Sequence, residues 1–202
     1  MTDDDADVEP GESERVTGTF LVAEADEEGD GAVLMDAERG RVHTLAEAGD
    51  LVAGEAVVGE LVADGAVGAV WRVAETTDRW EITVGESEES PTRNALDKAS
   101  DDVGELVRVE RAGEGELHLI TVPESGTEQA VADVLADEQG LRARAARLGV
   151  APVTARSAPG LVCVRYLPSL RRLIRACAGA VVSPHSSSRR STPPPTRPAS
   201  SR

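Results

Sequence analysis

The sequence predicts an α+β protein in which a small antiparallel β-barrel or sandwich precedes an α-β-α-β-β module. Two observations lead to this prediction. From residue 16 to residue 84, short segments rich in Val, Leu and Thr alternate with Gly and Asp turns, with no helical period between them. Beyond residue 90, apolar residues recur at the period of a helix. We therefore expect a barrel-like module at 16–85 and an α+β module at 90–168.

Five or six strands are expected in the first module. In RWEITV the alternation places Trp80 and Ile82 on one face, and in WRV Trp71 shares a face with Val73. Both tryptophans are therefore predicted to point into one core. The segment DAERGR is typical of a hairpin turn, in which Gly40 would supply a positive φ angle.

After the acidic linker GESEES, the sequence predicts a helix that ends at Gly113. Ser90 is its expected N-cap and Pro91 its first residue, because a serine oxygen accepts backbone N–H bonds and proline needs no N–H partner there. The apolar face of this helix is predicted to contain Leu96, Ala99, Val103, Leu106 and Val107.

A short strand, ELHLITVP, and a second helix are expected next. Ser125 and Glu128 have the spacing of a capping box at the start of this helix, and Gly149 would end it. Its predicted apolar face consists of Val131, Val134, Leu135, Leu141, Ala145 and Leu148.

The segment APVTARSAPGLVCVRYL predicts two closing strands around a Ser-Ala-Pro-Gly turn. Side chains on a strand point alternately to opposite faces. One face of the last strand should therefore carry Val162, Val164 and Tyr166, and the other Leu161, Cys163, Arg165 and Leu167.

Acidic side chains are confined to the first 168 positions. The chain has 37 acidic and 21 basic side chains and a net charge of −16, yet residues 169–202 contain seven arginines and no acid. A strongly negative chain repels itself in dilute salt, and molar salt screens that repulsion. We therefore expect a cytoplasmic protein of a salt-accumulating microbe.

The two ends of the chain differ from the rest in composition. Residues 1–15 are acidic and lack periodicity, which favours a disordered, solvated arm. Residues 169–202 are rich in Ser, Pro and Arg and predict a disordered basic tail. A frameshift after Pro168 is one hypothesis for this tail, and a genuine extension or a functional basic arm are the others. No apolar run approaches the ~20 residues of a membrane helix, so no membrane partner is expected.

No catalytic, cofactor-binding or metal-binding residue is predicted. The segment DEEGDGAVLMDA resembles a calcium loop at Asp26, Glu28, Asp30 and Gly31, but Ala37 replaces the glutamate that such a loop requires, so an acidic turn is expected. His43 and His118 lie on expected strands without a second metal ligand at helical spacing. A structural or surface role is expected for both, with a site assembled across the modules as the alternative. The glycines of AGEGEL precede a strand, whereas those of a phosphate loop follow one.

Several segments agree in order with one protein family. They are GTFLVAEAD, RVHTL, SPTRNA, ERAGEGELHLITVP, TEQAVADVLADE, LRARAARLGV and VRYLP, which together span about Thr17 to Pro168. The sequence resembles a haloarchaeal family of small acidic proteins catalogued as a conserved domain of unknown function. This resemblance implies a salt-adapted cytosolic protein without an assigned activity, and it carries over no catalytic residue.

The leading functional hypothesis is a non-enzymatic protein-binding or adaptor module with a protein partner, because two folded modules carry no recognised chemistry. A nucleic-acid-binding barrel is the first alternative. The acidic barrel segment and its few, apparently buried aromatic residues disfavour it. An enzyme with a dispersed site is the second alternative, which a structure would favour if it placed His43 or His118 in a cleft beside a carboxylate. The oligomeric state is left open.

Overall fold

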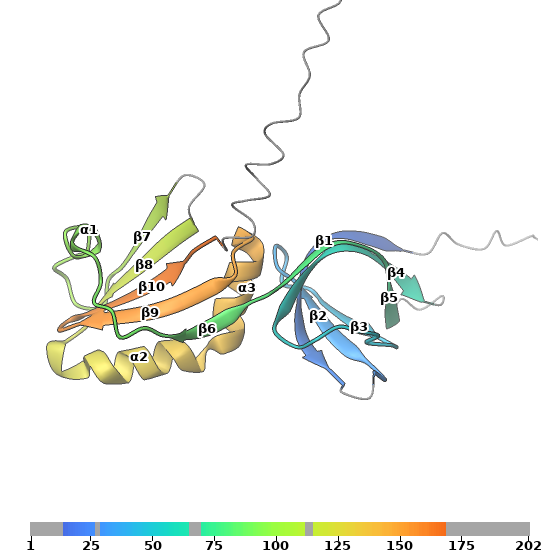
Figure 1. Cartoon of the computed structure of the whole chain (residues 1–202), viewed down its shortest axis with the longest axis horizontal. Helices are drawn as coiled ribbons and strands as arrows, with labels where there is room; N and C mark the ends of the chain where they lie inside the picture. The colour runs from blue at the N-terminus through green and yellow to red at the C-terminus, as the bar shows by residue number, and fades with distance from the viewer. Residues whose placement is uncertain (1–13, 27–28, 65–69, 112–114, 169–202) are drawn as a thin grey trace, which may run out of the picture. The chain divides into compact units, whose positions relative to one another are not determined.

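The computed structural model describes residues 14–26, 29–64, 70–111 and 115–168, which belong to a single structural unit. The chain is mostly β, with a closed five-stranded barrel, a second sheet and a few short helices (Figure 1). The predicted basic tail, and all but the last two residues of the predicted acidic arm, lie outside the described residues. None of the helices in the described ranges is long and apolar enough to span a membrane.

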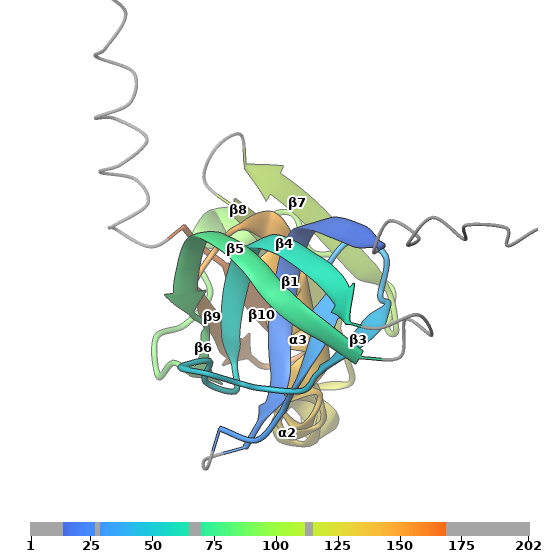
Figure 2. The same cartoon turned by 90° about the vertical axis from the view of Figure 1, so that its right-hand side faces the viewer.

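Five strands close the barrel (Figure 2) in the order β1-β2-β3-β5-β4. Their bounds are β1 (Arg15–Ala25), β2 (Ala32–Asp36), β3 (Val42–Leu45), β4 (Glu55–Asp64) and β5 (Val70–Glu81). The long strand β1 pairs with both β2 and β4, and β5 returns antiparallel to β4. β5 therefore runs parallel to β3, with Leu45 opposite Trp71, so the prediction of a wholly antiparallel barrel is wrong at this pair. This Greek-key order is that of an OB-type barrel.

The barrel core is formed by alternate residues of these strands. Phe20 and Val22 of β1 and Leu34 of β2 are fully buried in it. The DAERGR turn joins β2 to β3 as predicted, with Gly40 at a φ of 68°. The buried Asp36 carboxylate accepts hydrogen bonds from the backbone N–H groups of Glu38 and Arg39, which fixes this turn.

The two tryptophans lie in different cores, so the prediction of one shared core is wrong. Trp71 is buried in the barrel, whereas Trp80 packs against the core of the second sheet and donates its indole N–H to the Val150 carbonyl at 3.0 Å. Both residues belong to one continuous strand, β5, and an odd number of positions separates them. The pairing of β5 with β4 contains two register shifts, each of which adds one residue to β5. Two added residues leave the alternation of faces unchanged, so the two tryptophan side chains point to opposite faces.

The second sheet has the order β6-β9-β10-β8-β7. Its strands are β6 (Thr83–Glu86), β7 (Leu106–Arg111), β8 (Gly115–Thr121), β9 (Pro152–Ala158) and β10 (Leu161–Tyr166). β6 runs parallel to β9, and the other neighbours are antiparallel. The predicted turn between the closing strands is present, with Gly160 at a φ of 82°.

Helices cover both faces of this sheet. α2 (Thr127–Ala136) and α3 (Glu138–Leu148) pack on the face that carries Val162, Val164 and Tyr166. The short α1 (Arg93–Leu96) contributes Ala95 to the opposite face, where Leu161 and Cys163 are buried. The alternation predicted for the last strand is thus confirmed for the residues that these two cores contain.

The predicted helix that ends at Gly113 is wrong in most of its length. Only Arg93–Leu96 is helical, and its N-cap is Thr92 rather than Ser90. Gly104 then adopts a φ of 90°, and the chain enters β7, in which Leu106 pairs with Ile120. The predicted apolar stripe fails because its last members belong to a strand: Val107, together with Val109, packs in the core that contains Ala95 of α1.

The second predicted helix is divided into two by Asp137. α2 begins at Thr127 after the 3₁₀ turn η1 (Glu124–Gly126), and its N-cap Gly126 makes no side-chain hydrogen bond, so the predicted Ser125–Glu128 capping box is wrong. Asp137 instead caps α3 by accepting from the Gly140 backbone N–H at 3.2 Å. The predicted end at Gly149 is confirmed, because this residue adopts a left-handed φ of 67°.

Candidate binding cavity

The polar and charged side chains of the candidate site lie on the face of the second sheet that α2 and α3 cover. Arg108 on β7, His118 on β8 and Val164 on β10 pair across the sheet in one row. In the next row Glu116 pairs with Tyr166. Because strand side chains alternate, Glu116 and His118, two positions apart, point to the same face.

Glu116 is a buried carboxylate with two cationic or polar partners. Its side chain is 3% exposed, and Oε1 lies 2.7 Å from Nε2 of His118. Its other oxygen, Oε2, accepts a hydrogen bond from the Arg144 guanidinium of α3. Burial acts to raise the pKa of Glu116, but the hydrogen bonds from Arg144 and His118 outweigh it, so this pKa lies below its usual value. Glu116 is therefore ionised at neutral pH and holds Arg144 in place.

His118 is held as a neutral imidazole. Burial lowers its pKa below the usual value, and this effect exceeds the opposing effect of Glu116. The nearby charges of Arg144 and Arg108 lower the pKa of His118 further. An ionised carboxylate only accepts hydrogen bonds, so Nε2 must carry the proton, and Nδ1 is the unprotonated acceptor.

Tyr166 forms the wall beside this histidine. Its ring lies 5.0 Å from the His118 ring, centroid to centroid, at an interplanar angle of 57°. Burial raises the pKa of Tyr166 to about 12, so its phenol is neutral across the physiological range. The ring is 2% exposed and therefore acts as a fixed surface.

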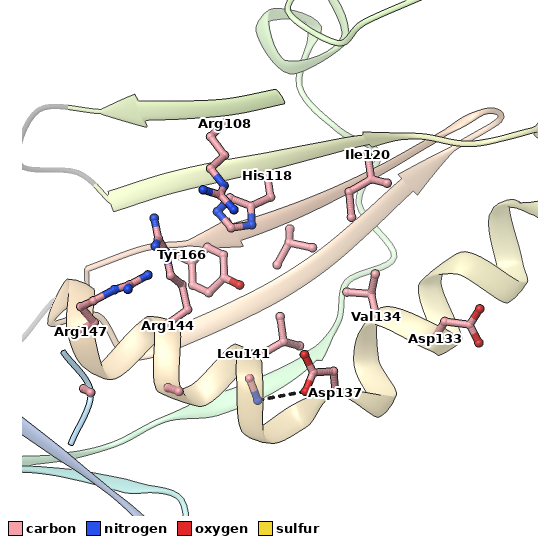
Figure 3. A pocket seen from close by; sticks show the side chains of 14 residues that line it. Arg108, His118, Ile120, Asp133, Val134, Asp137, Leu141, Arg144, Arg147 and Tyr166 are labelled. Carbon is pink, nitrogen blue, oxygen red and sulfur yellow. Dashed lines mark hydrogen bonds between the residues drawn. The ribbon is translucent and has the colours of Figure 1, made fainter. Parts of the chain in front are cut away.

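These residues line an open cavity of about 580 Å³. Figure 3 shows Arg108 pointing from β7 toward His118, with Arg144 and Arg147 of α3 on the same side of the cavity. Ile120 and Val134 lie farther along it, near Asp133. The volume falls within the range of small-molecule sites. We call this site the arginine cavity.

The three arginines have different surroundings. Arg144 is partly buried and paired with Glu116, whereas Arg108 and Arg147 are exposed. Arg144 and Arg147 are three residues apart on α3, a spacing that places side chains on one helix face. The cavity therefore has one arginine fixed by a carboxylate and two arginines at its rim.

The structure places the two predicted histidines in separate sites. His118 lies in the arginine cavity beside the Glu116 carboxylate, which is the arrangement that favours the enzyme alternative. His43 is 3% exposed within the barrel, edge-on to the Phe20 ring and 4.6 Å from the Trp71 ring, centroid to centroid. Burial lowers the pKa of His43, so it is a neutral core residue.

Glu116, Arg144 and Tyr166 were not predicted as site residues. The Glu-x-His pattern in ELHL was a usable signal for one pair, because positions two apart on a strand share a face. Metal-ligand spacing along a helix does not detect this pair, because its two residues lie on a strand. Arg144 comes from a helix far along the sequence, and its contact with Glu116 depends on how α3 packs.

A second cavity, of about 440 Å³, lies at the β1–β2 turn. It is lined by Glu24, Asp26 and Asp30 together with Thr44 of β3. Of the segment compared with a calcium loop, Asp26 and Asp30 line this cavity, and the Asp26 N–H donates to the Gly31 carbonyl; Glu28 lies outside the described residues. Across the described ranges, no three His, Cys, Asp or Glu side chains are grouped closely enough to hold a metal ion.

Comparison with known proteins places the chain in one family. Residues 16–157 match the sequence profile of DUF5812, described as a family of unknown function. No curated protein and no solved structure shows a significant match. The profile extends from the second residue of β1 to Ser157, the next-to-last residue of β9, and thus covers the barrel and most of the cavity residues. The chain belongs to the DUF5812 family of unknown function.

Proposed function

We propose that this protein is a non-enzymatic binding module and that the arginine cavity is its recognition site for a protein partner. The main support is the fixed position of Arg144, whose guanidinium is held by the buried Glu116. A prepositioned cation loses little side-chain freedom when it binds an anion. The partner is expected to contribute a negatively charged group.

The charge of the chain makes this cavity distinctive. The net charge of the sequence is −16, yet three arginines meet at one end of the cavity, and His118 there is neutral. Partly buried charges are screened less by salt than exposed ones. The cavity therefore provides a local attraction for an anion on a protein that otherwise repels anions.

Site-specific photocrosslinking tests this proposal. A benzoylphenylalanine placed at Asp133, on the cavity rim, should capture a partner in the native host, whereas the same group at the exposed Val42 of β3 should not. The adduct should disappear when Arg108→Gln and Arg147→Gln are combined. An adduct that forms equally at both positions, or that survives the double substitution, would contradict the proposal.

Nucleic-acid binding is less well supported by the barrel. OB-type barrels bind oligonucleotides on the β2–β3 face and at the neighbouring loops. Here the cavity at that face carries Glu24, Asp26 and Asp30, which would repel phosphates. A mobility-shift assay with single-stranded DNA and RNA should show no shift at micromolar protein, and a shift would revive this alternative.

An acid–base enzyme is the second candidate, and one observation favours it. Glu116 orients His118, and Nδ1 of the neutral ring is left able to accept a proton. Incubating small metabolites from the native organism with the protein tests this candidate. A compound that is consumed by the wild type but not by Glu116→Gln would support it, and an unchanged metabolite pool would count against it.

Salt adaptation and a cytoplasmic location also belong to this proposal. The strongly acidic composition supports both, because such a surface tolerates molar salt and is self-repelling without it. The dependence of the protein's stability on the KCl concentration tests this part.

A further inference from the structure

We infer that the arginine cavity selects a monocarboxylate attached to an apolar body. This inference rests on the proposed function, in that it names the chemical group that the recognition site takes. It is carried by the distribution of charged and apolar side chains along the cavity.

The arginine end fits a carboxylate. Arg108 and Arg147 are exposed at the rim, and Arg144 is held between them by Glu116. A guanidinium presents parallel N–H donors that match the two oxygens of a carboxylate. Three arginines face two carboxylates here, the buried Glu116 and the exposed Glu110 opposite it, while His118 is neutral, so this end retains positive charge for a further carboxylate.

The middle of the cavity is apolar. Ile120 on β8, Val134 on α2, Leu141 on α3 and Val164 on β10 all contribute to its lining. Ile120 follows His118 by two positions on the same strand, which corresponds to about 7 Å along the sheet. A ligand whose carboxylate lies near His118 would therefore extend its carbon chain over Ile120 toward Val134.

The far end disfavours a second negative charge. Asp133 lies beside Val134 at this end, and Asp137 lines the cavity next to Leu141, where its carboxylate caps α3. A dicarboxylate long enough to cross the apolar region would bring its second carboxylate toward these residues, and like charges repel. A nucleotide or a sugar phosphate would place its polar groups against the apolar lining. Those groups would lose their hydration there, which costs binding free energy.

The same chemistry could come from a free small molecule or from the C-terminus of a partner chain with an apolar last residue. Hexanoate represents the first source. The peptide acetyl-Ala-Leu-Leu with a free carboxylate represents the second, and its C-terminal amide is the matched control. Stronger binding of the peptide than of hexanoate, lost in the amide, would identify a chain terminus as the source.

Isothermal titration of the full chain in buffered KCl provides the primary test. Affinity should increase along acetate, butyrate and hexanoate by up to about fourfold for each methylene that is buried. Hexanoate should bind at least tenfold more tightly than hexylamine or adipate. Equal affinity for hexanoate and hexylamine, absence of a chain-length effect, or tighter binding of adipate would each overturn the inference.

Substitutions localise the binding. Arg147→Gln and Arg108→Gln should each weaken hexanoate binding at least fivefold, because both side chains are exposed at the rim and their loss leaves the core intact. Arg72→Gln removes the same charge from an exposed position on the barrel strand β5 and should leave the affinity unchanged. An equal loss in all three variants would show a general charge effect and overturn the assignment to this cavity.

The outcome also separates this inference from the proposed function. If the crosslinked partner depends on Arg108 and Arg147 but no monocarboxylate binds, the cavity is a recognition site for another group and the inference fails alone. If hexanoate binds and no partner is captured, the carboxylate site stands and the protein-binding proposal fails.

Discussion

Oε1 of Glu116 lies 2.7 Å from Nε2 of His118, two positions along the same strand, and the second oxygen of Glu116 accepts from Arg144. One buried carboxylate thus links β8 to α3. Because this carboxylate is ionised and the imidazole is neutral, its charge is directed toward Arg144. This side chain therefore fixes the positions of His118 and Arg144 in the cavity wall.

Glu116→Gln should therefore lower both the stability of the protein and the pKa of His118. Hydrogen bonds to charged groups contribute about 2 kcal/mol, so we expect a loss of about that size in the free energy of unfolding. The carboxylate acts to raise the pKa of His118, so its removal should shift this pKa further down. Urea unfolding and an NMR titration of the His118 ring measure the two effects.

Glu110→Gln is the matched control for this variant. Glu110 is exposed on β7 and lies directly opposite Glu116 in the sheet. The substitution therefore removes one negative charge from nearly the same place as Glu116→Gln does. If Glu110→Gln shifts the His118 pKa as strongly as Glu116→Gln, the effect is a general one of net charge and the specific role of Glu116 is refuted.

Stability should fall as the pH decreases from about 6.5. The pKa values of His43 and His118 are both lowered in the folded protein from 6.5, so below 6.5 the unfolded chain binds protons that the folded chain does not. The pKa of Glu116 is lowered from 4.5, which adds a further loss of stability as the pH falls below 4.5. Urea unfolding between pH 8 and pH 4 measures both ranges, and constant stability between pH 7 and pH 5.5 would refute the histidine contribution.

Local alternation was predictable from the sequence, and long-range placement was not. The two faces of β10 followed directly from the order of its residues, since Val162 and Val164 alternate with Leu161 and Cys163. The helix predicted through Val107 failed because the apolar residues Leu106 and Val107 fit a strand as well as a helix, and β8 was available to pair with them. No local pattern in either segment indicates that Arg144 meets Glu116.

His43→Phe should stabilise the barrel. The described residues provide no hydrogen-bond partner for either ring nitrogen of His43, and burying unpaired polar atoms costs free energy. Phenylalanine keeps an aromatic ring between Phe20 and Trp71. We expect an increase of about 1 kcal/mol in the free energy of unfolding at pH 7, measured in urea.

The pH dependence of stability in this variant tests the lowered pKa of His43 separately from the cost of its unpaired ring nitrogens. His43→Phe should also remove part of the stability loss below pH 6.5, because the unfolded variant no longer gains that proton. A variant that is less stable than the wild type at pH 7 would contradict a cost from the unpaired ring nitrogens, and an unchanged pH dependence would contradict a lowered pKa of His43 in the folded protein.

Gly115→Ala should disrupt the entrance to β8. Gly115 has a φ of 95°, and a Cβ placed there would lie 1.8 Å from the Tyr166 carbonyl oxygen. Both the backbone conformation and the contact oppose a side chain, so we expect a loss of at least about 2 kcal/mol in the free energy of unfolding. Gly85→Ala on β6 is the control, because a Cβ there meets nothing within 4 Å. This substitution should therefore change the free energy of unfolding only slightly. Equal stability of the two variants would contradict the close approach of β8 to Tyr166.

Removal of KCl should unfold the protein. Residues 1–168 carry a net charge of −23, so repulsion among carboxylates grows as the Debye length increases from about 3 Å in molar salt to about 30 Å in 10 mM salt. Circular dichroism during dialysis from molar to 10 mM KCl should show loss of the β signal, and restored salt should recover it. Replacing KCl by an equally concentrated neutral osmolyte controls for solvent exclusion, and a spectrum unchanged across the full range of KCl would refute salt adaptation.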